Sequence, residues 1–140
     1  MSSFTVPIDN ITHAPYIEVK VVANGNEYIG LAIIDTGAAM SGITKKAVKA
    51  LHLKRTGKHR VNTAKGKANV NYFVADIVLC NSVSFQNMFF DLFRSWKGGP
   101  DFLIGMDILS QGNFAITNYN NISLISFESP SRGNIDFSRL

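Results

Sequence analysis

The sequence contains a single cysteine, Cys80, so no disulfide can form within the chain. We therefore expect a cytoplasmic protein, because free thiols persist in reducing compartments. Cys80 follows the apolar run Ile77-Val78-Leu79, which favours a buried structural thiol over a nucleophile. The three histidines show no metal-ligand spacing and there is no cysteine cluster, so we expect neither a metal site nor a cofactor.

Long apolar runs are also missing. No run approaches the roughly 20 residues that a membrane-spanning helix needs, and the first residues lack the pattern of a signal peptide. We therefore expect no membrane partner. Glycine-rich phosphate loops and nucleophile-elbow serines are absent as well, which argues against those two classes of enzyme. The 140 residues, of which 46% are hydrophobic, suffice for one domain with a buried core.

Acidic residues are missing from one long segment. Nine of the fourteen Lys and Arg residues fall between Lys45 and Lys67, where the sequence has no Asp or Glu. Such a segment could attract an anionic partner, and a polyanion-binding protein stays open as an alternative. The segment has no Phe, Tyr or Trp on which bases could stack. We therefore favour a solvated helix face with loops, and nucleic acid is not the expected partner.

The sequence is mostly typical of β-strands. Alternating residues over 16–22, the turn residues Asn24-Gly25 and the apolar return over 27–34 predict a hairpin. An amphipathic helix is predicted over 45–51, with Thr44 or Ser41 as its N-cap. Further strands or hairpin arms are predicted at 4–8, 60–63 with 68–79, 83–93, 101–105, and 113–117 with 122–127, and one helical turn at 106–110.

The first hairpin leads into the run Leu31-Ala32-Ile33-Ile34-Asp35-Thr36-Gly37-Ala38-Ala39-Met40-Ser41. The apolar residues predict a buried strand, and the small residues after Asp35 predict a tight loop. A carboxylate carried into apolar surroundings is costly unless it is hydrogen-bonded, paired or used in chemistry. Asp35 is therefore the first candidate for a functional residue.

The segment Ile33-Ile34-Asp35-Thr36-Gly37-Ala38-Ala39 resembles the active-site loop of retropepsin-like aspartic proteases. The order of the other pieces agrees with that family, and in particular with its bacterial single-domain members. A hairpin precedes the loop, a glycine-tipped hairpin over 60–79 resembles the flap, and Leu103-Ile104-Gly105 resembles the apolar arm before a short helix. The resemblance spans residues 16–127.

The resemblance implies a mostly β, single-domain, closed β-barrel with a flap hairpin and one or two short helices. It implies an aspartic endopeptidase that hydrolyses peptides or proteins, with Asp35, Thr36 and Gly37 as catalytic residues. Six residues would contact the substrate: Ala38, Ala39, Met40, Lys65, Gly66 and Lys67.

Peptide hydrolysis by this route needs two carboxylates that share one proton, and the sequence has one suitable aspartate. Asp76 and Asp91 fall in predicted strands, and Asp101 precedes an apolar run. Asp107 is expected inside the short helix, as a helix-turn or salt-bridge residue. A homodimer with Asp35 of each copy on the two-fold axis is therefore the simplest solution.

We expect three regions in the chain. Residues 1–15 form an N-terminal segment that could supply a strand to the dimer, 16–127 form the protease-like domain, and 128–140 form a polar tail. A noncatalytic peptide-binding or dimerisation module of the same fold stays open as the alternative function.

Overall fold

The structure is a computed structural model that describes residues 2–139. Met1 and Leu140, the outer ends of the two predicted terminal segments, lie outside that range. The elements in chain order are β1 (Ser2–Pro7), β2 (Tyr16–Ala23), β3 (Asn26–Ile34), β4 (Gly42–Ile43), α1 (Lys45–Ala50), β5 (Gly57–Thr63), β6 (Gly66–Val78), β7 (Ser84–Leu92), β8 (Phe102–Ile104), α2 (Met106–Leu109), β9 (Asn113–Tyr119) and β10 (Ile122–Ser129), with short 3₁₀ turns at Cys80–Ser82 and Phe137–Arg139.

The hairpin of β2 and β3 forms where the alternating pattern predicts it. The two strands pair antiparallel from Tyr16 opposite Ile33 to Ala23 opposite Asn26. Asn24 and Gly25 make the turn with φ angles of 53° and 75°, the left-handed backbone that a two-residue hairpin turn requires. Strand β3 ends at Ile34, so the hairpin brings Asp35 to the end of the sheet.

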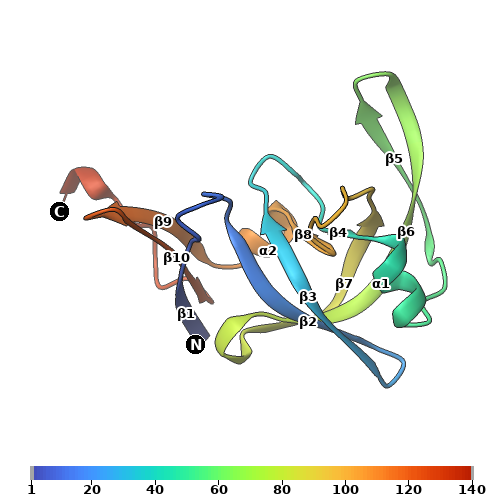
Figure 1. Ribbon diagram of the computed structural model, residues 1–140, viewed down its shortest axis with the longest axis horizontal. Coiled ribbons are helices and arrows are strands. Elements are labelled where there is room, and N and C mark those ends of the chain that lie inside the picture. Colours follow the sequence, from blue (N-terminus) through green and yellow to red (C-terminus); the bar gives the residue numbers. More distant parts are fainter. Residues whose placement is uncertain (1, 140) are drawn as a thin grey trace.

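Seven strands form one sheet in the order β2-β3-β8-β4-β7-β6-β5. Strand β2 also pairs with β6, so the six strands from β2 to β6 in this order close into a ring. Strand β5 pairs only with β6 and lies outside the ring. Strand β8 runs parallel to β3, and the two-residue strand β4 lies between β8 and β7. Figure 1 shows β5 and the start of β6 rising away from the body of the molecule.

The core lies among the strands of this ring. Its fully buried side chains come from strands that are distant in the sequence: Val21, Ile43, Ile77, Phe90, Phe102 and Ile104. Helix α1 adds Ala47 and the following Leu51, both fully buried. Burying such side chains stabilises the fold by about 1.5–3 kcal/mol for each large aliphatic or aromatic group.

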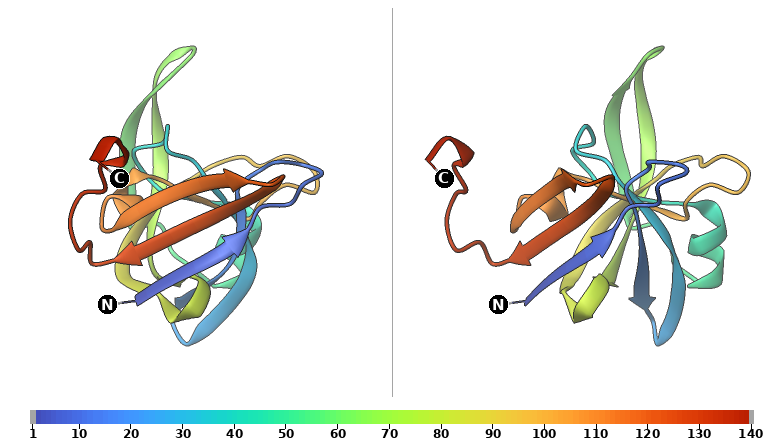
Figure 2. Two further views of the ribbon diagram at one scale, coloured as in Figure 1. Left: turned by 90° about the vertical axis from the view of Figure 1, so that its left-hand side faces the viewer. Right: turned by 60° about the vertical axis from the view of Figure 1, so that its left-hand side comes forward.

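A second, three-stranded sheet has the order β1-β10-β9. Figure 2 shows its strands side by side at one flank of the molecule. Phe4 of β1 and Phe127 of β10 are buried with their ring centroids 6.0 Å apart, and Phe127 also lies 6.2 Å from Phe85 of β7. These rings join the small sheet to the larger one. The N-terminal strand therefore packs on its own chain.

The predicted content, mostly β with one or two short helices, is confirmed: the structure has two, and the hairpins predicted over 60–79 and 113–127 are both present. Strand β10 continues to Ser129, two residues past the predicted end of the domain. No helix within residues 2–139 is long and apolar enough to cross a membrane.

The predicted N-cap is wrong in its chemistry. Thr44 occupies the N-cap position of α1, but its side chain makes no capping hydrogen bond. Ser41 lies before β4 and bonds elsewhere. Helix α1 is held instead by the burial of Ala47 and Leu51 against the sheet, which supplies more free energy than a cap does.

Candidate active site

Asp35 stands directly after β3 and is half-buried. Its backbone N–H donates to the carbonyl of Ile104 in β8 at 2.9 Å, which continues the parallel pairing of the two strands. Its side-chain Oδ1 accepts a hydrogen bond of 2.9 Å from the backbone N–H of Gly37. The carboxylate is therefore oriented by its own loop while it stays partly accessible to solvent.

Gly37 makes this close approach feasible. A Cβ at position 37 would lie 3.2 Å from Asp35 Oδ1, which is tighter than most side-chain contacts. Ala38 N–H donates back to the carbonyl of Asp35 at 3.2 Å and closes the turn. Thr36 is exposed.

The segment after β8 supports the loop from the other side. The N–H of Met106 donates to the carbonyl of Ala38 at 2.8 Å, and that of Asp107 donates to the carbonyl of Ala39 at 3.2 Å. A Cβ on Gly105 would lie 2.8 Å from the Ala38 carbonyl oxygen and 2.9 Å from the backbone of Met40. Only glycine allows the two segments to pack this closely.

Sequence reasoning missed the side chains that join the two segments. Ser41 is fully buried, and its hydroxyl donates to Asp107 Oδ1 at 2.8 Å. Ser41 N–H donates to Asp107 Oδ2 at 3.1 Å, and the Gly105 N–H donates to Ser41 Oγ at 3.0 Å. Asp107 is thus inside α2 as predicted, but it forms no ion pair within residues 2–139. No local pattern in the sequence indicates this pairing across 66 residues.

The predicted flap is the hairpin of β5 and β6. At its tip Thr63 Oγ1 donates to the Gly66 carbonyl at 2.7 Å and accepts from Lys65 N–H at 3.2 Å, and Gly66 has a φ of 110°. Lys65, Gly66 and Lys67 are all exposed. The tip projects away from the body in Figures 1 and 2, so the structure does not bring these three residues to the Asp35 loop.

A polar and aromatic cluster holds the base of the flap. His59 of β5 lies 2.5 Å from Asp91 Oδ1 of β7, measured at His59 Nδ1. The His59 ring stacks on Tyr72 of β6 with centroids 4.0 Å apart and planes within 6°. Strands β5 and β7 do not pair through their backbones, because β6 lies between them. The contact between His59 and Asp91 therefore links β5 to β7 through side chains alone. It too was missed by sequence reasoning.

Two further predictions concern metal binding and the reactivity of the Cys80 thiol. Within residues 2–139 no group of three or more His, Cys, Asp or Glu side chains could hold a metal. Cys80 is half-buried, and its thiol lies 3.9 Å from the Glu18 carbonyl, to which it donates. Burial raises the pKa of the Cys80 thiol, and the Glu18 charge adds to the effect. A protonated thiol is a poor nucleophile, in line with a structural role.

The chain is similar to known proteins. A family model described as aspartyl protease matches residues 17–108. The chain is similar in fold to a retropepsin-like aspartic protease from Rickettsia conorii, with a TM-score of 0.54 and 17% identity over 91% of this chain and 95% of that one. A second similar structure is the retroviral protease-like domain of Ddi1 from Leishmania major, with a TM-score of 0.47 and 15% identity over 81% of this chain and 94% of that one. No curated protein matches the chain.

The matched range contains the features built up above: the β2–β3 hairpin, the Asp35 loop, the flap hairpin and the segment from Gly105 into α2. The resemblance inferred from the sequence is confirmed. The chain belongs to the aspartyl protease family, and its fold is retropepsin-like.

Proposed function

We propose that the protein is an aspartic endopeptidase that works as a homodimer. The observation that carries the proposal is the state of Asp35: a half-buried carboxylate, oriented by Gly37 N–H, on a loop fixed by β8 and α2. Such a carboxylate is held in place but remains open to a water and a substrate. That combination suits a group which must act on a reacting atom.

The chemistry requires two carboxylates that share one proton. The ionised carboxylate accepts a proton from the attacking water, and the protonated one donates a hydrogen bond to the carbonyl of the scissile peptide. Two carboxylates about 3 Å apart do not both ionise at moderate pH, because the like charges repel. As water adds to the carbonyl carbon, one carboxylate takes a proton from the water and the other gives its proton to the carbonyl oxygen; when the C–N bond then breaks, the proton taken from water passes to the leaving amine and the diol returns a proton to the pair.

The second carboxylate comes from a second copy of the chain. Three other aspartates already have partners: Asp107 binds Ser41, Asp91 binds His59, and Asp76 accepts from Asn87 N–H. Asp101 stands just before β8, at the opposite end of that strand from the Ile104 carbonyl that binds the Asp35 N–H. A two-fold axis through the loop brings two Asp35 side chains together. Thr36 would then bond across the axis.

The substrate lies between the Asp35 loops and the flaps. Ala38, Ala39 and Met40 supply small or apolar walls beside the carboxylates. The flap tips, Lys65, Gly66 and Lys67, would move in from their exposed positions to cover the peptide and exclude water. We infer that the six-stranded ring is a closed barrel, because β2 pairs with both β3 and β6 and the ring therefore has no free edge.

The test is cleavage of a peptide library from pH 3 to 8, analysed by mass spectrometry. Wild-type protein should cut with a falling rate toward alkaline pH, where the pair loses its shared proton. Asp35→Asn should abolish every cut and leave folding and dimerisation intact. The matched control is Asp136→Asn, the same change at an exposed carboxylate of the tail, which should cut normally.

Two outcomes would contradict the proposal. Cuts that persist in Asp35→Asn would exclude an aspartic mechanism. A sedimentation run that finds a dimer with no cleavage at any pH would favour a noncatalytic peptide-binding module of the same fold.

A further inference from the structure

The two faces of the flap hairpin carry different kinds of side chain. Strands β5 and β6 pair from Gly57 opposite Tyr72 to Thr63 opposite Gly66 without a shift in register. Paired residues of a hairpin point to the same face, and successive residues of a strand point to opposite faces. One face, which we call the cationic face, therefore consists of Lys58, Arg60, Asn62, Lys67, Asn69 and Asn71. The opposite face includes His59, Val61, Val70 and Tyr72.

The cationic face continues the inner surface of the ring. Its alternating positions on β6 lead at the same spacing to Phe73 and Ala75, which are buried in the core. The opposite face continues the outer surface, where Tyr72 packs on Phe89 with ring centroids 5.3 Å apart and Phe89 is 44% exposed. The Asp35 loop and the flap stand at the same end of the ring in Figure 1. A flap that bends across this end therefore turns its cationic face toward the substrate.

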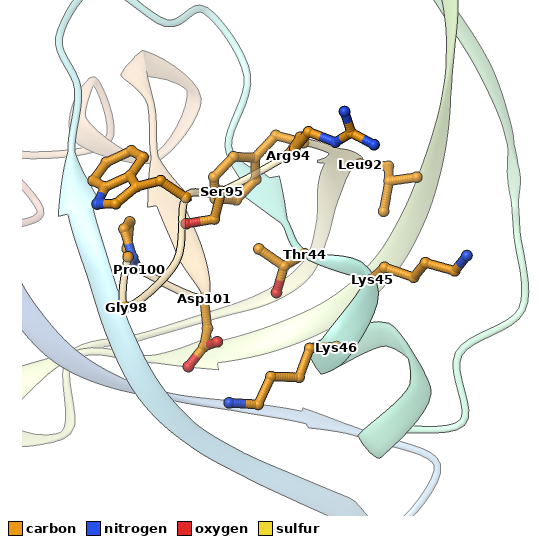
Figure 3. Close-up of a pocket in the computed structure, with 12 residues that line it drawn as sticks. Thr44, Lys45, Lys46, Leu92, Arg94, Ser95, Gly98, Pro100 and Asp101 are labelled. Carbon is orange, nitrogen blue, oxygen red and sulfur yellow. The ribbon is translucent and has the colours of Figure 1, made fainter.

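The chain itself does not balance the positive charge of this face. No Asp or Glu occurs from residue 36 to residue 75. Within residues 2–139, none of the three cations of the cationic face forms an ion pair. Two aspartates in or beside the ring have other neighbours: Asp91 of β7 contacts His59, and Figure 3 shows Lys46 pointing toward Asp101. The cationic face is therefore available to the carboxylates of a ligand.

The chemistry of this face suits a peptide that carries carboxylates. Lys and Arg form charge-assisted hydrogen bonds with carboxylates, and asparagine amides can both donate to and accept from a peptide backbone. A nucleic acid would find cations here but no ring on which a base could stack. The rings of His59 and Tyr72 stack on each other at the opposite face. The cationic face therefore fits an acidic peptide better than a nucleic acid.

We propose that the substrates are acidic peptides with Asp or Glu at alternate positions, which pair with Lys58 and Arg60 when the flap closes. The inference rests on the proposed function in one respect, that the flap closes over a peptide held at the Asp35 loop. Lys58 and Arg60 are two residues apart on one strand, about 7 Å along it. Alternate side chains of an extended peptide have the same spacing. A carboxylate on every second residue therefore matches both cations at once.

Three peptides of equal length test the preference, each with the same apolar pair at its centre. The first has Gln at every other position, the second has Glu at alternate positions, and the third has as many Glu residues at the intervening positions. Cleavage is measured at about pH 6, where glutamate is ionised. One of the two acidic peptides should be cut with a kcat/KM about fivefold above that of the neutral peptide, and the other should stay within about twofold of it. About 0.5 M NaCl should remove most of the difference.

Variants locate the preference on the flap. Lys58→Gln and Arg60→Gln should each lower the ratio of acidic to neutral cleavage about twofold, and the double variant should bring the ratio close to one. Both side chains are exposed, so their replacement leaves the core intact. The matched control is Lys49→Gln, the same loss of charge at an exposed position of α1, which should keep the wild-type ratio.

A binding assay separates this inference from the peptidase proposal. Labelled forms of the three peptides are titrated with the Asp35→Asn protein, and fluorescence anisotropy should show the same preference for one acidic peptide. If wild-type protein cuts none of the peptides but this preference in binding is present, the peptidase proposal fails and the acidic preference stands. If all three peptides are cut equally, the reverse holds.

Four results would overturn the inference: no binding of any peptide, equal gains for both acidic peptides, an unchanged ratio in the double variant, or tighter binding of a single-stranded RNA of equal charge than of the preferred peptide. Equal gains would indicate diffuse attraction by net charge without a matched contact. Tighter binding of RNA would assign the cationic face to a nucleic acid.

Discussion

Ser41 and Asp107, 66 residues apart, are joined by a hydrogen bond of 2.8 Å beneath the loop that carries Asp35. Ser41 is fully buried and also accepts from the N–H of Gly105. One hydroxyl therefore ties the end of the loop to the start of α2. We propose that this pair positions Asp35, because it joins the loop of Asp35 to α2 without bonding to the Asp35 carboxylate.

Ser41→Ala should destabilise the protein by about 1–3 kcal/mol, because it leaves the Asp107 carboxylate and the Gly105 N–H without their partner. Chemical denaturation would measure the loss. Ser110→Ala, at an exposed position just after α2, is the control and should stay within about 0.5 kcal/mol of wild type. Equal stability of the two variants would show that the bond contributes nothing.

Gly105→Ala should be harmful although the added group is one methyl. The new Cβ would lie 2.8 Å from the Ala38 carbonyl oxygen and 2.9 Å from the Met40 backbone, so backbone must move. We expect a loss of about 1–3 kcal/mol and a large drop in cleavage at temperatures where the variant is still folded. Wild-type cleavage by a folded Gly105→Ala protein would show that the loop tolerates displacement.

Asp91→Asn should loosen the base of the flap, because it removes the charge that pairs with His59. Hydrogen exchange of the amides in β5 should speed up about tenfold, while exchange in the β2–β3 hairpin stays unchanged. Asp76→Asn is the matched control: this β6 carboxylate accepts from Asn87 N–H and has no histidine partner. Unchanged exchange in β5 of Asp91→Asn would assign the flap base to the aromatic stack alone.

Cys80 should react slowly with iodoacetamide. Burial raises the pKa of its thiol, so at pH 8 a smaller fraction is thiolate than in an ordinary free thiol. The alkylation rate should keep rising with pH beyond the point where N-acetylcysteine levels off. Equal rates for the two thiols across that range would contradict the shift.

Local patterns predicted the long elements well. The turn at Asn24-Gly25 and the alternation beside it led correctly to β2 and β3, and the small residues after Asp35 led to its loop. These features depend on residues that are neighbours in the chain. The family resemblance rested on such local motifs and on their order along residues 16–127.

Features that depend on distant residues were not predictable. Strand β4 has two residues and exists only because β7 and β8 lie on either side of it. The pairing of β1 with β10, the Ser41–Asp107 bond and the His59–Asp91 pair have no local signal either. The capping role expected of Thr44 followed from residue preference, and its burial is a tertiary effect.

The contacts between the Asp35 loop and α2 have one more consequence. The carbonyls of Ala38 and Ala39 accept from backbone N–H groups, so no side chain at these two positions takes part in the bonds. Their side chains could therefore be exchanged over evolutionary time, or in the laboratory, without shifting the aspartate. Under the proposed function, residues 38 and 39 are the natural positions at which to diversify this scaffold toward new cleavage preferences.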